Sequence, residues 1–256
     1  MLSCGLNDRG QTLLGEVQEK VSELREIDSL DALEVSKISA GSRFVLILAN
    51  NGTLKGAGEC IHGQLGIEKN DFFVELRNIP FPHKVLSIAT SSCASIVLTE
   101  EGVFGCGDDP VVNNSNRFLK IAAFADKKIT QIAAGYSHYF VMDDHGDIFG
   151  WGTHADGELG IGKPEELISE GDNLIVPAKV VFNVKDEKLK TIHAGKNFTI
   201  FSSHSGKLYS CGIGSSGALG LLTKVNYAKP TLIKLLDKFA AVQVVCGGKY
   251  SACLTG

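Results

Sequence analysis

The sequence predicts an all-β protein assembled from repeated units of about 50 residues. Two observations carry this prediction. Glycine is abundant, with 29 in 256 residues, where an average chain of this length has about 18. The glycines also recur in a fixed pattern, and strand-like apolar segments with turn signals fill the intervals between them.

Three segments align without a gap, at 41–58, 135–152 and 195–212. Each begins with a glycine, continues with an apolar run, turns at a second glycine and closes on a third. The first and closing glycines are Gly41 and Gly58, Gly135 and Gly152, and Gly195 and Gly212. A second block follows each segment and ends in Gly-x-Leu-Gly, as in "THADGELG" (153–160).

We call the segment with three glycines the first half of a unit, and the block that follows it the second half. Partial copies complete the set at 2–15, 91–107 and 247–256, so the chain holds five first halves and five second halves. An alternating strand such as "ITQIAA" (129–134) precedes each first half. The turns "NNG", "EEG", "DHG" and "HSG" favour hairpins, because such turns need positive φ. Short strands at this spacing are typical of a β-propeller. We therefore expect one propeller domain over residues 1–256, with five blades.

The printed chain begins and ends midway through a unit. Joining the C-terminal segment 247–256 to the N-terminal segment 2–15 would give one complete unit. The ring would then have no exposed sheet edge. We therefore expect residues 2–5 to pair with the segment around 249–255, so that strands from both ends close the ring.

One helix is also expected, at 16–27. In that segment Val17, Val21, Leu24 and Ile27 share a face at helical spacing. A short helix of this kind would pack on the outside of the ring.

The segment "AAGYSHYFVMDDHGDIFGWGTHADGELGIG" (133–162) resembles the repeat of the RCC1 (regulator of chromosome condensation) family at nearly every position. His138 and Trp151 stand at the histidine and tryptophan positions of that repeat. The resemblance covers essentially the whole chain and implies an RCC1-type β-propeller. WD40 repeats fit less well because the Trp-Asp pair is absent, and kelch repeats because Gly247-Gly248 is the one Gly-Gly pair at a matching position.

The segment "GIGSSG" (212–217) spells the Gly-x-Gly-x-x-Gly fingerprint of a dinucleotide site, which requires a helix after its third glycine. The residues that follow lack a helical apolar stripe, so we attribute these glycines to the repeat and interpret Gly214 as a local irregularity. Five of the seven cysteines (4, 106, 211, 246 and 253) fall at repeated apolar positions, and no Cys-x-x-Cys pair occurs. We expect no metal, no cofactor and no catalytic residue.

The net charge of −4 and a pI of about 6.0 argue against direct binding of nucleic acid. No apolar run is long enough to cross a membrane, and the first residues lack a signal-peptide pattern. An odd number of cysteines fits a reducing compartment. These features predict a monomeric intracellular protein, cytoplasmic or nuclear.

Three functions are open at this point. The first is a binding scaffold whose face loops dock a protein partner. The second, implied by the resemblance, is guanine-nucleotide exchange on a Ran-like small GTPase. The third is a proteinaceous enzyme inhibitor. None of the three makes the chain itself an enzyme.

The candidate partner-binding residues lie in the acidic loops of the best-preserved copy, because loops on a rigid scaffold commonly carry recognition. They are Asp143, Asp144, His145, His154, Asp156 and Glu158, followed by the acidic segment 163–172. We interpret His138 as a structural histidine that is hydrogen-bonded between strands.

Overall fold

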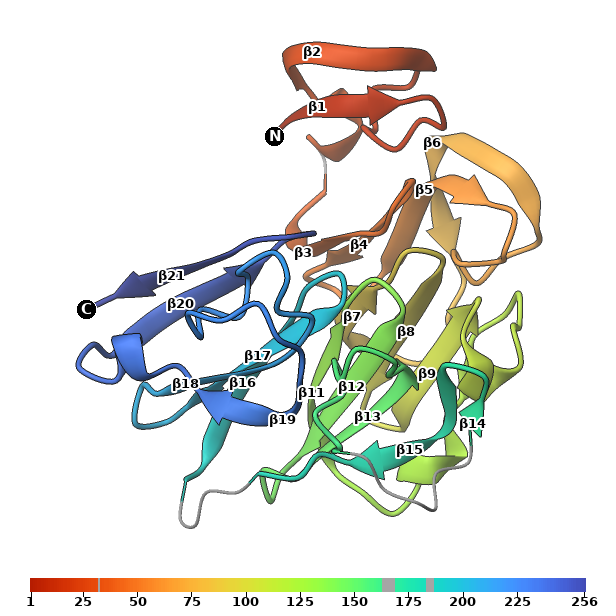
Figure 1. Ribbon diagram of the computed structural model, residues 1–256. Coiled ribbons are helices and arrows are strands. Elements are labelled where there is room, and N and C mark those ends of the chain that lie inside the picture. Colours follow the sequence, from red (N-terminus) through yellow and green to blue (C-terminus); the bar gives the residue numbers. More distant parts are fainter. Residues whose placement is uncertain (32, 163–168, 183–186) are drawn as a thin grey trace. The chain divides into compact units, whose positions relative to one another are not determined.

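The computed structural model describes residues 1–31, 33–162, 169–182 and 187–256 (Figure 1). Their regular elements are β-strands and short 3-10 helices, which confirms the predicted all-β class. The chain divides into two compact units, Met1–Ala125 and Asp126–Gly256. In the part of the chain that is described, no helix is long and apolar enough to cross a membrane.

The first unit contains three antiparallel sheets. A two-stranded sheet comes first, formed by β1 (Leu2–Asn7) and β2 (Gln18–Glu26). Two four-stranded sheets follow, formed by β3 (Val35–Ala40), β4 (Phe44–Ala49), β5 (Leu54–Cys60) and β6 (Asn70–Ile79), and by β7 (Val85–Thr90), β8 (Ala94–Thr99), β9 (Gly102–Gly107) and β10 (Leu119–Lys120). The 3-10 helices of this unit are η1 (Asp28–Leu30), η2 (Pro110–Val112) and η3 (Ala122–Phe124).

The second unit also contains three antiparallel sheets. The first is formed by β11 (Ile129–Ala134), β12 (His138–Asp143), β13 (Ile148–Thr153), β15 (Asn173–Lys179) and β14 (Ser169–Glu170), in that spatial order. The second is formed by β16 (Leu189–Ala194), β17 (Phe198–Ser203), β18 (Leu208–Gly212) and β19 (Tyr227–Leu232). After η4 (Lys234–Leu236), β20 (Ala241–Cys246) and β21 (Ser251–Thr255) form a two-stranded sheet.

One strand register recurs in all four complete sheets. The second strand of each pairs its first residue with the closing glycine, and the pairs are Phe44–Gly58, Ala94–Gly107, His138–Gly152 and Phe198–Gly212. The predicted turn glycines Gly52, Gly146 and Gly206 have φ of +86°, +84° and +83°. The copies that align without a gap in the sequence therefore also share one strand register in the structure.

The predicted pairing of residues 2–5 with the segment around 249–255 is not among the strand pairs of the described residues. Strand β1 pairs with β2 from Leu2–Glu26 to Asn7–Gln18, and β21 pairs with β20. Among the described strands, none pairs with the second edge of β1 or of β21. The structure therefore contains four complete sheets and two separate two-stranded sheets, in place of five blades closed by both ends.

The helix predicted at 16–27 is wrong, because most of this segment is strand β2. The expected apolar face is not buried as a unit: Val21 and Ile27 are 3% exposed, whereas Val17 and Leu24 are 47% and 64% exposed. Strand β1 supplies backbone hydrogen-bond partners along β2, and this pairing overrides a weak helical pattern.

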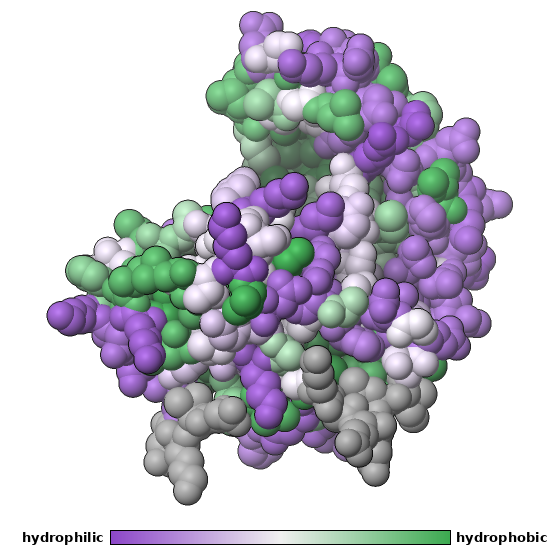
Figure 2. All heavy atoms as spheres, viewed as in Figure 1, coloured by the Kyte–Doolittle hydropathy of each residue, from purple (hydrophilic) through white to green (hydrophobic). Residues whose placement is uncertain are grey.

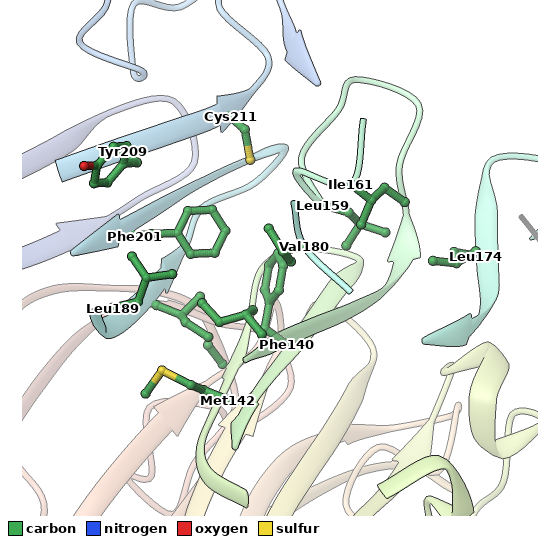
Figure 3. Packing of buried hydrophobic residues seen from close by; sticks show 13 residues of the cluster. Phe140, Met142, Leu159, Ile161, Leu174, Val180, Leu189, Phe201, Tyr209 and Cys211 are labelled. Carbon is green, nitrogen blue, oxygen red and sulfur yellow. The ribbon is translucent and has the colours of Figure 1, made fainter. Parts of the chain in front are cut away.

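The core of the second unit lies between the sheets β11–β15 and β16–β19 (Figure 3). Phe140 of β12 and Phe201 of β17 meet edge to face, with ring centroids 5.7 Å apart. Leu159, from the Gly-x-Leu-Gly motif, is fully buried in the same cluster. Burying a leucine side chain contributes about 1.5–3 kcal/mol, which explains why the motif keeps this residue.

The sheet β20–β21 exposes more apolar surface than the complete sheets do. Tyr250 is 67% exposed, whereas Phe198, at the equivalent position, is fully buried. Leu254 is 60% exposed and Val242 is 62% exposed. Hydrophobic residues accordingly gather over this sheet in Figure 2.

The cysteines predicted at apolar core positions follow the same distinction. Cys106 and Cys211, in complete sheets, are fully buried. Cys246 and Cys253 in β20–β21 are half-buried, and Cys4 in β1 is exposed. The core prediction is therefore confirmed for the complete sheets and wrong for Cys4, whose strand belongs to a two-stranded sheet.

Candidate partner-binding surface

Each complete sheet of the second unit has two opposite ends, separated by the length of its strands. The turn end carries the tight turns 143–147 and 203–207. The loop end carries the residues after each first glycine and each closing glycine, at 135–137, 153–157, 195–197 and 213–216. The loop 247–249, which precedes β21, is the equivalent of 135–137 and 195–197.

The six residues predicted to bind a partner are divided between these ends. Asp143, Asp144 and His145 lie at the turn end, and His154, Asp156 and Glu158 lie at the loop end. The structure therefore does not bring the six into one site. Of the acidic segment 163–172, residues 163–168 lie outside the described residues.

At the turn end, carboxylates are compensated within the chain. Asp143 is 4% exposed, and its Oδ1 accepts hydrogen bonds from the backbone N–H groups of His145 (3.0 Å) and Asp147 (2.9 Å). Its Oδ2 lies 3.8 Å from Lys127 Nζ. Asp147 forms an ion pair with Lys179, with 2.6 Å between Oδ2 and Nζ.

The same turn brings three potential metal ligands together. One ligand atom each from Asp143, Asp144 and His145 lies within 4.8 Å of the others. Both oxygens of Asp143 already face donors, and His145 Nδ1 lies 3.0 Å from Asp144 Oδ1. Because these contacts account for the cluster, we assign no metal to it.

The loop end has a buried polar chain beneath its surface. His138 is fully buried, and its Nε2 lies 3.0 Å from the Thr199 hydroxyl, which donates to the backbone carbonyl of Glu158 at 2.8 Å. Since the Thr199 hydroxyl donates its proton to the Glu158 carbonyl, its oxygen accepts a hydrogen bond from His138 Nε2–H. Burial lowers the pKa of His138 to about 3, so the ring is neutral and links two sheets. Trp151 is also fully buried and stacks on Tyr139.

The bond from Thr199 recurs in other copies, which the sequence comparison did not anticipate. Ser95 donates to the carbonyl of Gln64 at 2.6 Å, and Ser251 donates to that of Ala218 at 2.7 Å. In each case a hydroxyl on one sheet bonds the residue before Leu-Gly in the preceding copy. The sequence signal is a serine or threonine four residues after the first glycine or its equivalent.

Glu158 is 1% exposed and is therefore not on the surface where a partner would meet it. Burial raises the pKa of its carboxyl to about 7, although Oε2 accepts a hydrogen bond from the Asp156 N–H at 2.9 Å. Gln64, the equivalent residue, accepts the corresponding bond from the N–H of His62 at 3.0 Å. The side chain at this position thus holds the loop that precedes it.

The first and closing glycines are places of close approach. A Cβ at Gly135 would collide with the ring of His138. Gly152 has a φ of +92°, and a Cβ there would lie 2.5 Å from the carbonyl oxygen of Ser137. The same collisions would occur at Gly41 and Gly195, which face rings, and at Gly58 and Gly212, which face carbonyls.

Gly214 has a structural reason that is specific to its own copy of the repeat. A Cβ at Gly214 would collide with the backbone carbonyl of Val225. Its N–H donates to Asn226 Oδ1 at 3.1 Å. The residues after Gly217 form turns and not the helix that a dinucleotide fingerprint needs.

The exposed part of the loop end is aromatic and basic. Tyr136 is 45% exposed, and Lys196 Nζ lies 4.9 Å from the centroid of its ring. The carboxylate of Asp156 accepts hydrogen bonds from the Nδ2 atoms of Asn197 and Asn226, both at 2.9 Å. His154 is half-buried, and no partner of its Nε2 is found among the described residues.

Comparison with known families identifies the repeat. Models of the regulator of chromosome condensation (RCC1) repeat match residues 129–158 and 205–254. The chain contains RCC1 repeats. The first match spans the positions of His138, Trp151 and Glu158.

Curated relatives match nearly the whole chain. The probable E3 ubiquitin-protein ligase HERC6 of Homo sapiens is 27% identical over 272 residues, which cover 98% of this chain and 25% of the relative. The ultraviolet-B receptor UVR8 of Arabidopsis thaliana is 26% identical over 272 residues, which cover 99% of this chain and 58% of the receptor. The chain thus spans a quarter to somewhat over half the length of these two relatives.

Solved structures of RCC1 proteins share the fold. Human WBSCR16 has a TM-score of 0.84 at 20% identity, with 100% of this chain and 71% of that chain covered. Yeast RCC1 (Prp20), solved with Kap60, has a TM-score of 0.82 at 21% identity, with 96% and 59% covered. The chain is therefore an RCC1-type β-propeller protein in fold.

Proposed function

We propose that this chain is a non-catalytic scaffold that binds a protein partner through the loop end of its second unit. The observation that carries the proposal is the contrast in charge between the two ends. Carboxylates of the turn end pair with Lys127 and Lys179, whereas Lys196 and Lys249 at the loop end form no ion pair among the described residues.

Exposed aromatic residues support the same surface. Tyr136 and Tyr250 are 45% and 67% exposed. Tyrosine is enriched in protein interfaces, because it supplies a large contact area and a hydrogen-bonding group. Asp156 and Asn197 hold the loops between these aromatic residues in place, so the surface is organised before a partner binds.

The relatives support binding over catalysis. Their names include a probable ubiquitin ligase and an ultraviolet-B receptor, and the same repeat region occurs in both. A region shared by proteins of such different activities is better explained as a recognition module. We propose that the chain acts inside the cell, as a monomer that binds protein and not nucleic acid; a relative named as mitochondrial, RUG3, adds that compartment to the cytoplasm and nucleus.

Affinity capture with matched variants tests the proposal. Tyr136→Ala with Lys196→Ala removes exposed side chains at the loop end, and Asp144→Ala with His145→Ala does the same at the turn end. We expect specific co-purifying proteins to be lost with the first pair and kept with the second. If both double variants have equal melting temperatures and recover the same proteins in equal amounts, the loop end is not the binding surface.

Guanine-nucleotide exchange on a Ran-like small GTPase is a second candidate. It is supported by the fold shared with yeast RCC1 (Prp20), a protein that binds Gsp1p and histones. A nucleotide-release assay with Ran tests it directly. Release at the intrinsic rate would exclude exchange activity, and accelerated release would replace the scaffold proposal.

A further inference from the structure

A cavity of about 330 Å³ opens at the loop end, where the sheets β16–β19 and β20–β21 meet. Its walls come from three loops, the residues being Lys196, Asn197, Ile213, Ser215, Ser216, Gly248 and Lys249. Cavities that bind ligands in proteins occupy about 300–1,000 Å³, so this one is large enough for a single side chain or a small charged group.

At the cavity, one inter-sheet hydrogen bond that occurs at two other junctions is not found among the described residues. At the equivalent junctions, the N–H of Ser42 donates to Ser92 O at 3.4 Å and that of Tyr136 donates to Gly195 O at 3.1 Å. Within the described residues, the N–H of Lys196 has no such acceptor. The loop 247–249 is therefore not tied to the loop 195–197.

The walls of the cavity are rich in positive charge and in donors. Lys196 and Lys249 are exposed and form no ion pair within the described residues. Ser215 and Ser216 add two hydroxyls, and the backbone N–H of Gly248 has no acceptor in the described part of the chain.

Asp156 is an acidic residue that contacts the cavity lining through Asn197, and both of its carboxylate oxygens accept hydrogen bonds. Its two carboxylate oxygens accept hydrogen bonds from Asn197 and Asn226, each at 2.9 Å. Asn226 in turn accepts from the N–H of Gly214, which anchors the loop 213–216. The same network that holds the Asp156 carboxylate therefore fixes one wall of the cavity.

We infer that this cavity binds an anionic group, carboxylate or phosphoryl, carried by the protein partner. Lys196, Lys249, Ser215, Ser216 and Gly248 all line one small space. Lysine ammonium groups, hydroxyls and backbone N–H groups are donors that recognise anions. The inference rests on the proposed function, since it names the chemistry of the partner at that same surface.

Gly248 allows a precise test of charge inside the cavity. A Cβ at this position meets no atom within 4 Å, and its φ is not in the left-handed region. Gly248→Glu therefore adds a negative charge at the cavity wall, and Gly248→Gln adds a side chain of nearly the same size without charge. Melting temperatures of both variants check that the fold is intact.

The probes are three short fluorescent peptides of one sequence, with glutamate, phosphoserine or glutamine at the central position, measured by fluorescence anisotropy. We expect the glutamate or the phosphoserine peptide to bind, the glutamine peptide to bind at least about tenfold more weakly, and affinity to fall as salt is added. Gly248→Glu should weaken binding about tenfold or more, and Gly248→Gln, which adds similar bulk without charge, should weaken it clearly less. Comparing the first two peptides tells which anion is preferred.

Equal binding of all three peptides, or no binding of any of them, would overturn the inference. Equal effects of Gly248→Glu and Gly248→Gln would do so as well, because size and not charge would then decide. Affinity capture separates this failure from that of the proposed function. If Gly248→Glu still recovers the partner that Tyr136→Ala with Lys196→Ala loses, the loop end binds protein but the cavity does not bind its anion.

Discussion

The two ends of the second unit are built from the same repeat, yet they use charge in opposite ways. At the turn end, Asp143 and Asp147 are matched by Lys127 and Lys179, and the turns are closed by their own side chains. At the loop end, polar groups that hold the fold are buried beneath an exposed aromatic and basic surface. The turn end therefore pairs its charged groups within the chain, whereas the loop end has exposed hydrogen-bond donors that a partner could use.

The largest effect should come from glycine substitutions that compare the two ends. Gly152→Ala at the loop end combines a φ of +92° with a Cβ 2.5 Å from a carbonyl oxygen, and we expect a loss of at least about 3 kcal/mol. Gly146→Ala at the turn end has a φ of +84° but meets no atom within 4 Å, so we expect about 1 kcal/mol. Thermal unfolding checks both, and equal shifts would refute the close approach at Gly152.

The buried carboxyl of Glu158 should make stability depend on pH. Burial raises its pKa to about 7 in the folded chain, above the usual 4.5, so its stabilising contribution is complete below pH 4.5. The contribution is lost as the pH rises to about 7, by up to roughly 3 kcal/mol.

Glu158→Gln is the matched control, since Gln64 stands at the same position of another copy. The stability difference between wild type and this variant should fall between pH 4.5 and pH 7 and then stay level. Chemical denaturation across this range measures it. A difference that does not change with pH would contradict a protonated Glu158.

A smaller effect is expected from the hydroxyl that joins the two complete sheets. Thr199→Val removes the donor to Glu158 O and the acceptor for His138, which should cost about 1–2 kcal/mol. Thr199→Ser keeps the hydroxyl, as Ser95 and Ser251 do in other copies, and should cost less than about 1 kcal/mol. Similar losses for both variants would mean that the methyl group, and not the hydrogen bonds, matters at this position.

The smallest effect should come from the turn end. The pair between Asp147 and Lys179 is exposed, with 42% and 57% of the side chains accessible. Exposed ion pairs contribute about 0–1 kcal/mol, so Lys179→Met should leave the melting temperature nearly unchanged and should not alter partner binding. A large loss of partner binding would instead place recognition at the turn end.

Much of the repeat could be predicted from the sequence because its rules are local. The spacing from Gly135 to Gly152 predicts a hairpin, and the apolar run that follows Gly135 predicts a buried strand, which is buried along its whole length as β12. The roles of Gly52 and Gly206 follow from turn geometry alone. The fold class and the strand register therefore needed no knowledge of contacts between copies.

What the sequence could not predict depends on partners far along the chain. The strand β2 was taken for a helix because its pairing with β1 is not visible in its own periodicity. Glu158 was expected on the surface because it is charged, whereas the loop it supports turns it inward. The basic cavity was missed because Lys196 and Lys249 lie about 50 residues apart in sequence and are brought together by the packing of successive sheets.

Hydrogen exchange of the chain with and without its captured partner tests the central claim most directly. If the loop end is the binding surface, amide exchange should slow at residues 135–137, 195–197, 213–216 and 247–249 when the partner is bound. Exchange at the turns 143–147 and 203–207 should not change. Protection confined to those turns, with the loop end unaffected, would contradict the account.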